Sequence, residues 1–356
     1  MHLLDDLQYV KKIDKSNVYG SVVALADQIK DTWLSFKNLD LPTECSLAEN
    51  VVISGMGGSA LGGRVIKSLL KDRVRIPIEV VTDFHLPSYV NDNSLVILSS
   101  YSGNTEETLA AAHDTLRRHA KIFIITTGGK LETLARENNL PLYLIYPKFN
   151  PSNQPRTATG YSIVSIMALL ARCNFIHLTD EEIGEAEIVV RKFTNEFSVE
   201  VKESNNLAKR TAVKLKNNMA ILIASEHLVG AAHVMKNQLN ENSKTFSCLF
   251  DLPELNHHLM EGLRNPAEAK KFWHIIFFES DKYSDEIIKR YPITEEVVTK
   301  NDVGYSAYKL RSDKKLEQIF EVITFGSFVN FYLAVLYGID PAPIPWVDYF
   351  KQKLAT

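Results

Sequence analysis

Two segments rich in glycine and hydroxyl groups have residue types and spacing suited to binding a small anion. Residues 54–63 read Ser-Gly-Met-Gly-Gly-Ser-Ala-Leu-Gly-Gly, and residues 99–108 read Ser-Ser-Tyr-Ser-Gly-Asn-Thr-Glu-Glu-Thr. Glycine lets the backbone approach an anion closely, while short hydroxyls and N–H groups at a helix start donate hydrogen bonds to its oxygens. Because a dinucleotide site does not need the second segment, the pair predicts a compact phosphate monoester as ligand. The candidate phosphate ligands are Gly57, Gly58, Ser59, Ser100, Ser102, Asn104 and Thr105.

Each segment also has a simpler interpretation. The first can be a tight strand-to-helix turn without a ligand, and its glycines fit the G-x-G-x-x-A spacing of a dinucleotide fold. An NAD-dependent oxidoreductase, with Asp83 as the ribose-binding acid, therefore stays open, although it leaves the second segment unexplained. The second segment is also typical of a helix start, and we expect Asn104 or Thr105 to cap that helix.

The second half of the chain contains groups suited to proton transfer on a phosphosugar. Glu241 stands in an Asn-Glu-Asn run, and His257 follows it by sixteen residues, at the end of Pro-Glu-Leu-Asn-His. Arg156 follows a proline between the two halves, and Lys351 lies near the C-terminus. Residue type alone leaves these roles open, since an Asn-Glu-Asn run is usually a solvated turn. The nearest rivals are Glu254, His258 and Lys353.

Short apolar runs alternating with helical patterns must position these groups. Strand-like runs in the first half lie at 50–54, 78–82, 95–98, 122–126 and 142–145, with helix-like segments between them. After a break at 150–160 and a charged connector at 180–208, a second alternation includes strand-like runs at 219–224, 246–250 and 273–279. This alternation predicts an α/β fold with parallel sheets covered on both faces. The expected divisions are a helical lead-in (1–49), a first α/β subdomain (50–178) and a second one with the C-terminal helices (179–356).

The two anion-binding segments resemble the phosphate-sugar loops of the sugar isomerase (SIS) fold. With the runs around Arg156, Glu241, His257 and Lys351, the chain from about Val51 onward resembles the bifunctional phosphoglucose/phosphomannose isomerase family. The resemblance implies two SIS-type subdomains, each with a mostly parallel five-stranded sheet flanked by helices. It also implies a homodimer in which the neighbouring subunit supplies His257, and a reaction that needs no metal or other cofactor.

The resemblance assigns a chemical role to each candidate catalytic residue. Glu241 would be the base that moves a proton between C2 and C1 through a cis-enediolate. His257, helped by Lys351, would open the sugar ring, and Arg156 would stabilise the developing negative charge. The implied reaction interconverts glucose 6-phosphate and fructose 6-phosphate. The resemblance also implies use of mannose 6-phosphate, but Ile344, which offers no hydroxyl, stands seven positions before Lys351, where archaeal-type members carry a hydroxyl residue.

The composition excludes several other classes of protein. Forty Lys and Arg against 43 Asp and Glu give a net charge of −3, which argues against a nucleic-acid-binding surface. No run approaches the roughly 20 apolar residues of a membrane span, and the N-terminus does not resemble a signal peptide. The spacing of Cys45, Cys173 and Cys248 predicts neither disulfides nor zinc, so we expect a reduced, cytoplasmic protein. A non-catalytic phosphosugar-binding regulator is the main alternative, although residues 1–49 have little of the basic character of a DNA-binding appendage.

Overall fold

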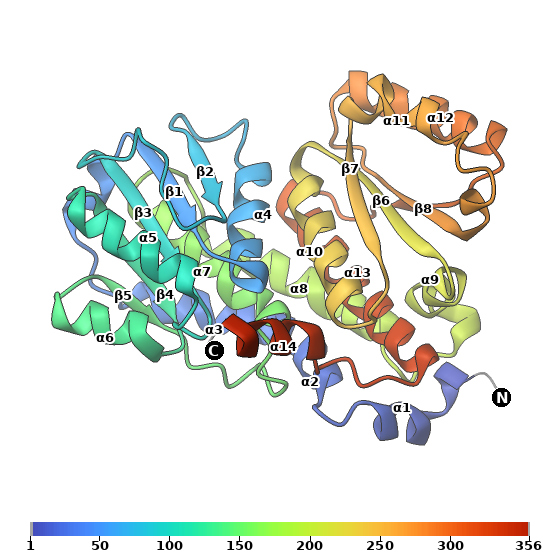
Figure 1. The fold of residues 1–356 in the computed structure, drawn as a ribbon, viewed down its shortest axis with the longest axis horizontal. Helices are drawn as coiled ribbons and strands as arrows, with labels where there is room; N and C mark the ends of the chain where they lie inside the picture. The colour runs from blue at the N-terminus through green and yellow to red at the C-terminus, as the bar shows by residue number, and fades with distance from the viewer. Residues whose placement is uncertain (1–2, 355–356) are drawn as a thin grey trace.

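The first sheet contains five parallel strands in the order β2-β1-β3-β4-β5 (Figure 1). The computed structural model describes residues 3–354. The strands are β1 (Asn50–Ser54), β2 (Ile78–Val81), β3 (Ser94–Ser99), β4 (Lys121–Thr126) and β5 (Leu142–Leu144). All five apolar runs that the sequence predicted as strands in this half are therefore confirmed.

Helices cover both faces of this sheet, as its apolar central strands require. Every residue of β3 is buried, and β1 is buried except at its first residue, which is typical of parallel strands between two helical layers. The surrounding helices are α4 (Leu61–Leu69), α5 (Glu106–Arg117), α6 (Gly129–Glu137) and α7 (Thr159–Arg172). Because the strands are parallel, the segments that follow β1 and β3 lie at the same edge of the sheet.

The second sheet contains four parallel strands, in the order β7-β6-β8-β9, so the prediction of five strands is wrong for this half. The strands are β6 (Met219–Ser225), β7 (Ser247–Leu252), β8 (Trp273–Glu279) and β9 (Gly304–Lys309). The five residues between β9 and the next helix include Arg311, Ser312, Asp313 and Lys314, so no apolar run is left to form a fifth strand. The helices around the sheet are α9 (Leu207–Leu215), α10 (Val229–Glu241), α11 (Leu259–Gly262) and α12 (Asp285–Lys300).

A long apolar helix, α13 (Lys315–Tyr337), packs against α9, α10 and the helix α8 (Asp180–Phe197). By length and composition alone it could cross a membrane, which corrects the expectation that no run is long enough. However, 94% of its most apolar window is buried inside the protein. Its hydrophobic residues therefore build the core between the second sheet and the N-terminal helices.

Helices before and between the sheets join the two halves. The lead-in forms α1 (Leu7–Ile13), α2 (Val18–Val23) and α3 (Leu25–Lys37), as the helical spacing of its apolar residues predicted. The charged stretch that was expected to be a connector begins with α8 (Asp180–Phe197), which packs against both α3 and α13. The division near residue 178 therefore stays a prediction, since α8 contacts elements on either side of it.

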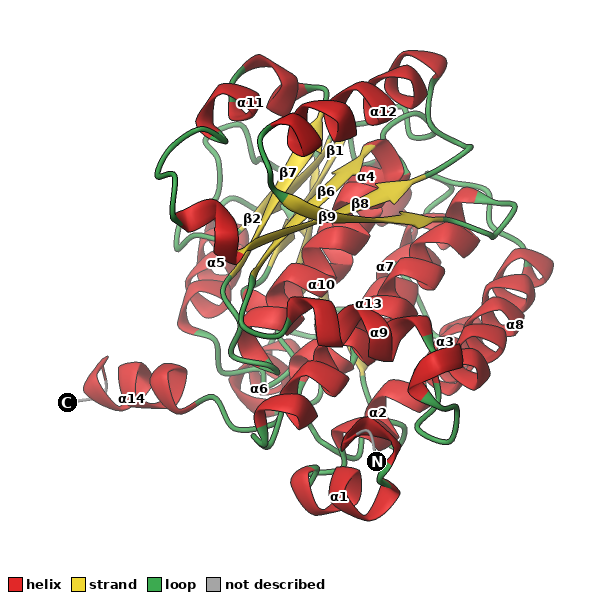
Figure 2. Cartoon of the chain, turned by 90° about the vertical axis from the view of Figure 1, so that its right-hand side faces the viewer, coloured by secondary structure: helices red, strands yellow, loops and turns green. Residues whose placement is uncertain are grey.

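The last helix of the described chain projects from the rest of the molecule. Figure 2 shows α14 (Pro345–Leu354) extending away from the body, and none of its residues is buried. Its exposed aromatic side chains include Trp346 and Phe350, which are 82% and 60% exposed. Such exposure of large apolar groups is typical of a surface that another chain covers.

Candidate active site

The two anion-binding segments lie side by side and are joined by hydrogen bonds. The backbone N–H of Tyr101 donates to the Ser59 hydroxyl over 2.9 Å, and the Ser99 hydroxyl donates to the Ser59 carbonyl over 3.0 Å. The Ser59 hydroxyl therefore faces the neighbouring loop and is largely buried. Gly57 adopts a φ of +50°, a conformation that favours glycine. Gly58 packs on Arg156, because a Cβ at Gly58 would lie 2.8 Å from the Arg156 backbone nitrogen.

The second segment leaves the start of α5 without a side-chain cap, which corrects the expectation of capping. Thr105 occupies the N-cap position, but its side chain makes no capping hydrogen bond. Its hydroxyl instead lies 2.8 Å from that of Ser100, while Ser102 and Asn104 are exposed. The N–H groups of the first helical turn thus lack a capping side chain beside two hydroxyls, an arrangement suited to a phosphate.

In the second sheet, α12 follows β8 as α5 follows β3, but a carboxylate lies at the start of α12. Glu226 directly follows β6, the counterpart of β1 in strand order. Its carboxylate accepts hydrogen bonds from the N–H and hydroxyl of Ser284, the N-cap residue of α12, over 3.1 and 2.7 Å. The Glu226 carboxylate thus occupies the start of α12, whereas no side chain caps the start of α5. Of the two, the start of α5 is therefore the one suited to an external phosphate.

Arg156 lies almost fully buried between the first anion-binding segment and the end of the chain. Its side chain is 1% exposed. Its Nη2 donates to the carbonyls of Pro341 and Ala342 over 3.0 and 2.6 Å, and Nη1 donates to Gln154 over 2.9 Å. Burial lowers its pKa, and nearby carboxylates partly oppose that effect. An arginine stays protonated in such a site, so it presents a fixed positive charge.

Glu241, the last residue of α10, meets this charge. Its Oε2 lies 3.4 Å from Nη1 of Arg156, and its side chain is 27% exposed. Burial raises the pKa of Glu241, while the charges of Arg156, Lys244 and Lys351 act in the opposite direction. A carboxylate whose pKa is moved toward neutrality is a stronger base at working pH, as proton abstraction from carbon requires. The structure thus brings two of the four candidate catalytic residues into direct contact.

Lys244 is a site residue that the sequence analysis did not select. Its ammonium donates to the carbonyls of Asn242, Asp340 and Pro341 over 3.1 to 3.3 Å. Burial and the charge of Arg156 lower its pKa to about 8. The only sequence signal was its place three residues after Glu241, and a lysine just beyond a helix is normally a surface charge.

Lys351 and Ile344 belong to the projecting C-terminal segment. Lys351 is exposed on α14, yet its charge acts on the Glu241 carboxylate, so the helix passes near the site. The negative charge of Asp348, one turn earlier on α14, likewise acts on a site residue, because it raises the pKa of Arg156. Ile344 precedes α14, and its carbonyl accepts the N–H of Asp348 over 3.1 Å. Both residues therefore lie on the segment that Arg156 holds through two carbonyls.

His257 does not join the other candidates within one chain. Glu241 ends α10 before β7 begins, whereas His257 ends the short 3-10 helix η7 (Glu254–His257), which follows β7. The six residues of β7 span roughly 16 Å, so the two side chains lie toward opposite ends of the strand. His257 and His258 are both exposed.

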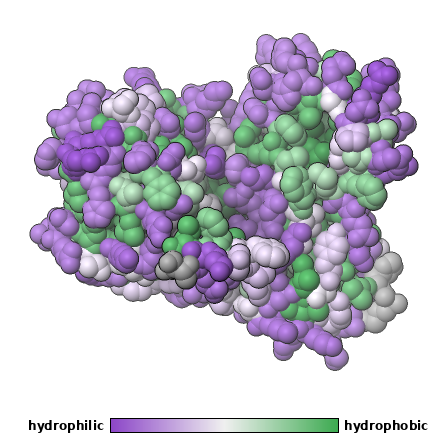
Figure 3. Space-filling view, in the orientation of Figure 1, coloured by the Kyte–Doolittle hydropathy of each residue, from purple (hydrophilic) through white to green (hydrophobic). Residues whose placement is uncertain are grey.

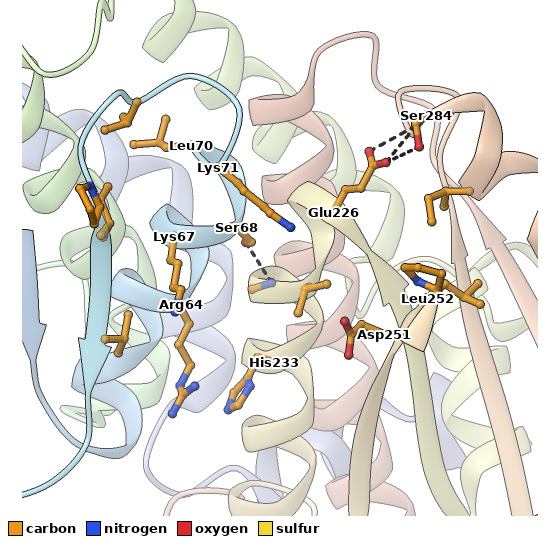
Figure 4. Close-up of a pocket in the computed structure, with 18 of the residues that line it drawn as sticks. Arg64, Lys67, Ser68, Leu70, Lys71, Glu226, His233, Asp251, Leu252 and Ser284 are labelled. Carbon is orange, nitrogen blue, oxygen red and sulfur yellow. Dashed lines mark hydrogen bonds between the residues drawn. The ribbon is translucent and has the colours of Figure 1, made fainter. Parts of the chain in front are cut away.

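A cleft of about 1010 Å³ separates the two halves above α4 and α10 (Figure 4). Basic side chains line the side nearer the first sheet, among them Arg64, Lys67 and Lys71. Burial lowers the pKa of Arg64, and burial together with nearby Lys236 and Arg64 lowers that of His233 to about 3. Acidic groups line the opposite side, among them Glu226, Asp251 and Glu286. Within residues 3–354, no group of three or more metal-binding side chains comes together.

Comparison with known proteins decides the family. The chain is 34% identical to the bifunctional phosphoglucose/phosphomannose isomerase of Caldicellulosiruptor bescii, over 95% of this chain and 99% of that protein. This chain belongs to the bifunctional phosphoglucose/phosphomannose isomerase family. A second member, from Thermoplasma acidophilum, is 29% identical over 86% of this chain and 90% of its own length.

The domain matches cover both halves of this phosphoglucose/phosphomannose isomerase family member. Residues 46–172 match the SIS domain, and residues 204–354 match the bacterial phospho-glucose isomerase C-terminal SIS domain. Among solved structures, the C-terminal domain of glucosamine-fructose-6-phosphate aminotransferase from Francisella tularensis has a TM-score of 0.68 at 15% identity, covering 94% of this chain and 97% of that one. A glucose-6-phosphate isomerase like protein from Thermus thermophilus has a TM-score of 0.63 at 14% identity, covering 98% and 100%. These likenesses confirm the predicted SIS-type fold.

Proposed function

We propose that the protein interconverts glucose 6-phosphate and fructose 6-phosphate. The observation that carries this proposal is the position of Arg156. Its backbone packs on Gly58 of the first anion-binding segment, and its guanidinium lies 3.4 Å from the Glu241 carboxylate. One residue thus links a phosphate-binding loop to a base. A six-carbon sugar phosphate needs these two features at opposite ends of one pocket.

The phosphate would bind at the loops that follow β1 and β3. We assign it to the backbone of Gly57 and Gly58, to the hydroxyls of Ser100 and Thr105, and to the uncapped start of α5. Ser102 and Asn104 would close the rim of this pocket, since both are exposed there. The Ser59 hydroxyl accepts the Tyr101 N–H, which leaves its own O–H to donate to the phosphate.

Glu241 would carry out the proton transfer in the open-chain sugar. Its carboxylate takes the proton from C2 of the aldose, and a cis-enediolate forms. The same carboxyl group returns the proton to C1, while the hydroxyl proton passes from O2 to O1 and leaves a ketone at C2. Arg156 stabilises the developing charge from the Nη1 side, which already faces the carboxylate. A general base of this kind contributes roughly 10²- to 10⁴-fold in rate.

The ring-opening groups would come from His257 and Lys351, with His257 supplied by a second copy of the chain. Ring opening moves one proton onto the ring oxygen and one away from O1, and a histidine can both give and take protons near neutral pH. Two surfaces favour a homodimer: the exposed aromatic residues of α14 and the apolar surface over β7, seen in green in Figure 3. The basic side of the cleft also complements the acidic groups around His257 on a second copy, namely Asp251, Glu254 and Glu261.

Mannose 6-phosphate is the second substrate that we propose, and a substitution at position 344 tests this proposal. Glucose and mannose differ only at C2, so the enediolate must present its other face to the same carboxylate. Ile344 offers no hydroxyl to assist that rotation. We expect Ile344→Thr to raise kcat/KM for mannose 6-phosphate relative to glucose 6-phosphate by up to about tenfold, the worth of one hydrogen bond.

The test is a coupled assay of the purified protein, with EDTA present, in which fructose 6-phosphate is supplied and glucose 6-phosphate is detected. Mannose 6-phosphate is supplied in a parallel assay. Turnover by the unaltered protein that is lost in Glu241→Gln supports the proposal. We place such an enzyme in the cytoplasm, where hexose phosphates are metabolised. Sugar phosphate binding without turnover would instead favour the regulator, and tight binding of NAD would favour the oxidoreductase.

A further inference from the structure

The guanidinium of Arg156 has a protein acceptor for each of its donor directions. Nη2 donates to two carbonyls at the end of the chain, and Nη1 donates to Gln154 and Glu241. The remaining donor, Nε, donates to Oδ1 of Asn242. A charged group held in this way has little freedom to rotate, so the acceptor at Nε acts together with those at Nη1 and Nη2 to set how Nη1 points at the base.

Asn242 belongs to a closed ring of hydrogen bonds that begins and ends at Arg156. Its Nδ2 donates to Oδ1 of Asn330 over 2.6 Å. The Nδ2 of Asn330 donates to Oε1 of Gln238 over 3.0 Å, and Nε2 of Gln238 donates to the backbone carbonyl of Arg156 over 2.9 Å. The ring therefore forms hydrogen bonds with both the side chain and the main chain of Arg156.

All members of this ring are buried to the same degree. Arg156, Gln238, Asn242 and Asn330 are each 0 to 1% exposed. Buried amides need all their partners, because an unpaired polar group costs about 1–3 kcal/mol. In each amide of the ring, the oxygen accepts a hydrogen bond from one neighbour and the nitrogen donates one to another. A 180° flip of any of these amides would therefore break two hydrogen bonds. The orientation of Asn242, and with it that of Nε, is thus determined by the ring.

We propose that Asn242 is a positioning residue, which acts through Arg156 to hold the guanidinium against the Glu241 carboxylate. The inference rests on the proposed function, in which Glu241 is the base. Asn242 follows Glu241 directly and is the C-cap residue of α10, so one short stretch sets both the base and its counter-charge. A purely structural asparagine would support the fold without affecting the ionisation of Glu241.

The first test replaces Asn242 by alanine. Its loss leaves Nε without a partner and removes one of the bonds that orient the guanidinium, so Nη1 is held less firmly against the base and the charge that lowers the pKa of Glu241 acts less strongly. We expect kcat to fall by about 10- to 100-fold, KM for fructose 6-phosphate to change by less than about threefold, and the acidic limb of the kcat/KM profile to move to higher pH.

A matched control is Asn206→Ala. Asn206 is fully buried in the same half of the chain, where it donates to the Ser198 carbonyl and accepts the Lys209 N–H. It does not contact Arg156. We expect this variant to lose thermal stability as Asn242→Ala does, but to keep the kcat and pH profile of the unaltered protein per folded molecule.

Asn242→Asp keeps the test informative if the alanine variant folds poorly. The aspartate retains an acceptor for Nε but loses the donor to Asn330, so kcat should recover at least part of the loss. The inference is overturned if the alanine variant keeps its kcat and its acidic limb, or if the aspartate variant is no faster than the alanine variant. If the unaltered protein itself shows no turnover, the proposed function fails first and this inference fails with it.

Discussion

Nη1 of Arg156 lies 3.4 Å from Oε2 of Glu241, although the two residues are 85 positions apart in the sequence and one follows the first sheet while the other lies between two strands of the second. The contact joins the end of α10 to the segment that follows β5. Burial raises the pKa of the carboxyl group, and the guanidinium limits that rise. Burial and the guanidinium thus act in opposite directions on the pKa of the carboxyl group that we propose as the base.

Mixing two inactive variants tests whether His257 acts across a dimer. Glu241→Gln and His257→Ala should each lose most activity, since one lacks the proposed base and the other the proposed ring-opening group. If each site combines Glu241 of one chain with His257 of the other, an exchanged heterodimer regains one intact site. We expect the equilibrated mixture to recover up to about a quarter of the activity, as random pairing allows. Recovery should be absent when Glu241→Gln and Arg156→Lys are mixed, because both changes lie on the same chain of each site.

Substitution of Ser100 by alanine tests the phosphate site. Ser100 lies beside the uncapped start of α5, so the loss of its hydroxyl should weaken phosphate binding. We expect KM for fructose 6-phosphate to rise about tenfold with kcat within about threefold, the pattern of lost uniform binding. Ser280→Ala is the matched control, because Ser280 follows β8 as Ser100 follows β3, yet its hydroxyl donates to Gln318. A KM rise as large in the control would contradict this assignment.

Lys244→Met tests the electrostatic role of the lysine beside the base. The positive charge of Lys244 lowers the pKa of Glu241, so its removal should raise that pKa and shift the acidic limb of kcat/KM to higher pH. The control is Lys289→Met, which removes an exposed charge from α12. An unchanged acidic limb in Lys244→Met would mean that the Lys244 ammonium does not act on the reacting carboxylate.

Glu295 makes the stability of the protein depend on pH. Burial and the neighbouring Glu279 raise its pKa to about 7, from 4.5 for an ordinary glutamate. The folded protein therefore holds this proton more tightly, and the associated stability, present below pH 4.5, is lost as pH rises through 7. We expect Glu295→Gln to raise the melting temperature more at pH 8 than at pH 5. The corresponding gain in the free energy of unfolding is about 1 kcal/mol, because solvent screens this partly exposed group.

Glu296→Gln provides the opposite control for that experiment. Glu296 is exposed and pairs with Lys300 over 2.5 Å, which lowers its pKa. Its replacement should give a small loss of stability at pH 8 and none of the gain expected for Glu295→Gln. Equal melting temperatures of Glu295→Gln and the unaltered protein at both pH values would contradict the raised pKa of Glu295.

The sequence predicted the parts of the molecule that depend on local pattern. The strands that precede the two anion-binding segments are short apolar runs, and the hydroxyls of Ser100 and Thr105 meet because the two residues lie five positions apart in one loop. Capping by Thr105 was predicted wrongly, because the hydroxyl of Ser100 competes for the same side chain. Such competition is decided by loop geometry, which spacing does not reveal.

Features that depend on distant contacts could not be predicted from the pattern. Nothing near Lys244 in the sequence indicates that carbonyls from 340 and 341 surround its ammonium. The closed ring through Asn330 likewise joins residues 88 positions apart. The second sheet stops at four strands because the chain turns into the apolar helix α13, whose residues resemble those of a buried strand in composition.

The two carbonyls that hold Nη2 of Arg156 are about 185 residues farther along the chain. At synthesis rates of about 5–20 residues per second, they leave the ribosome roughly 10 to 40 seconds after the arginine. Until then the guanidinium lacks the two acceptors that hold Nη2. Assembly of the proposed active site thus waits for residues 341 and 342, long after the two anion-binding segments have been made.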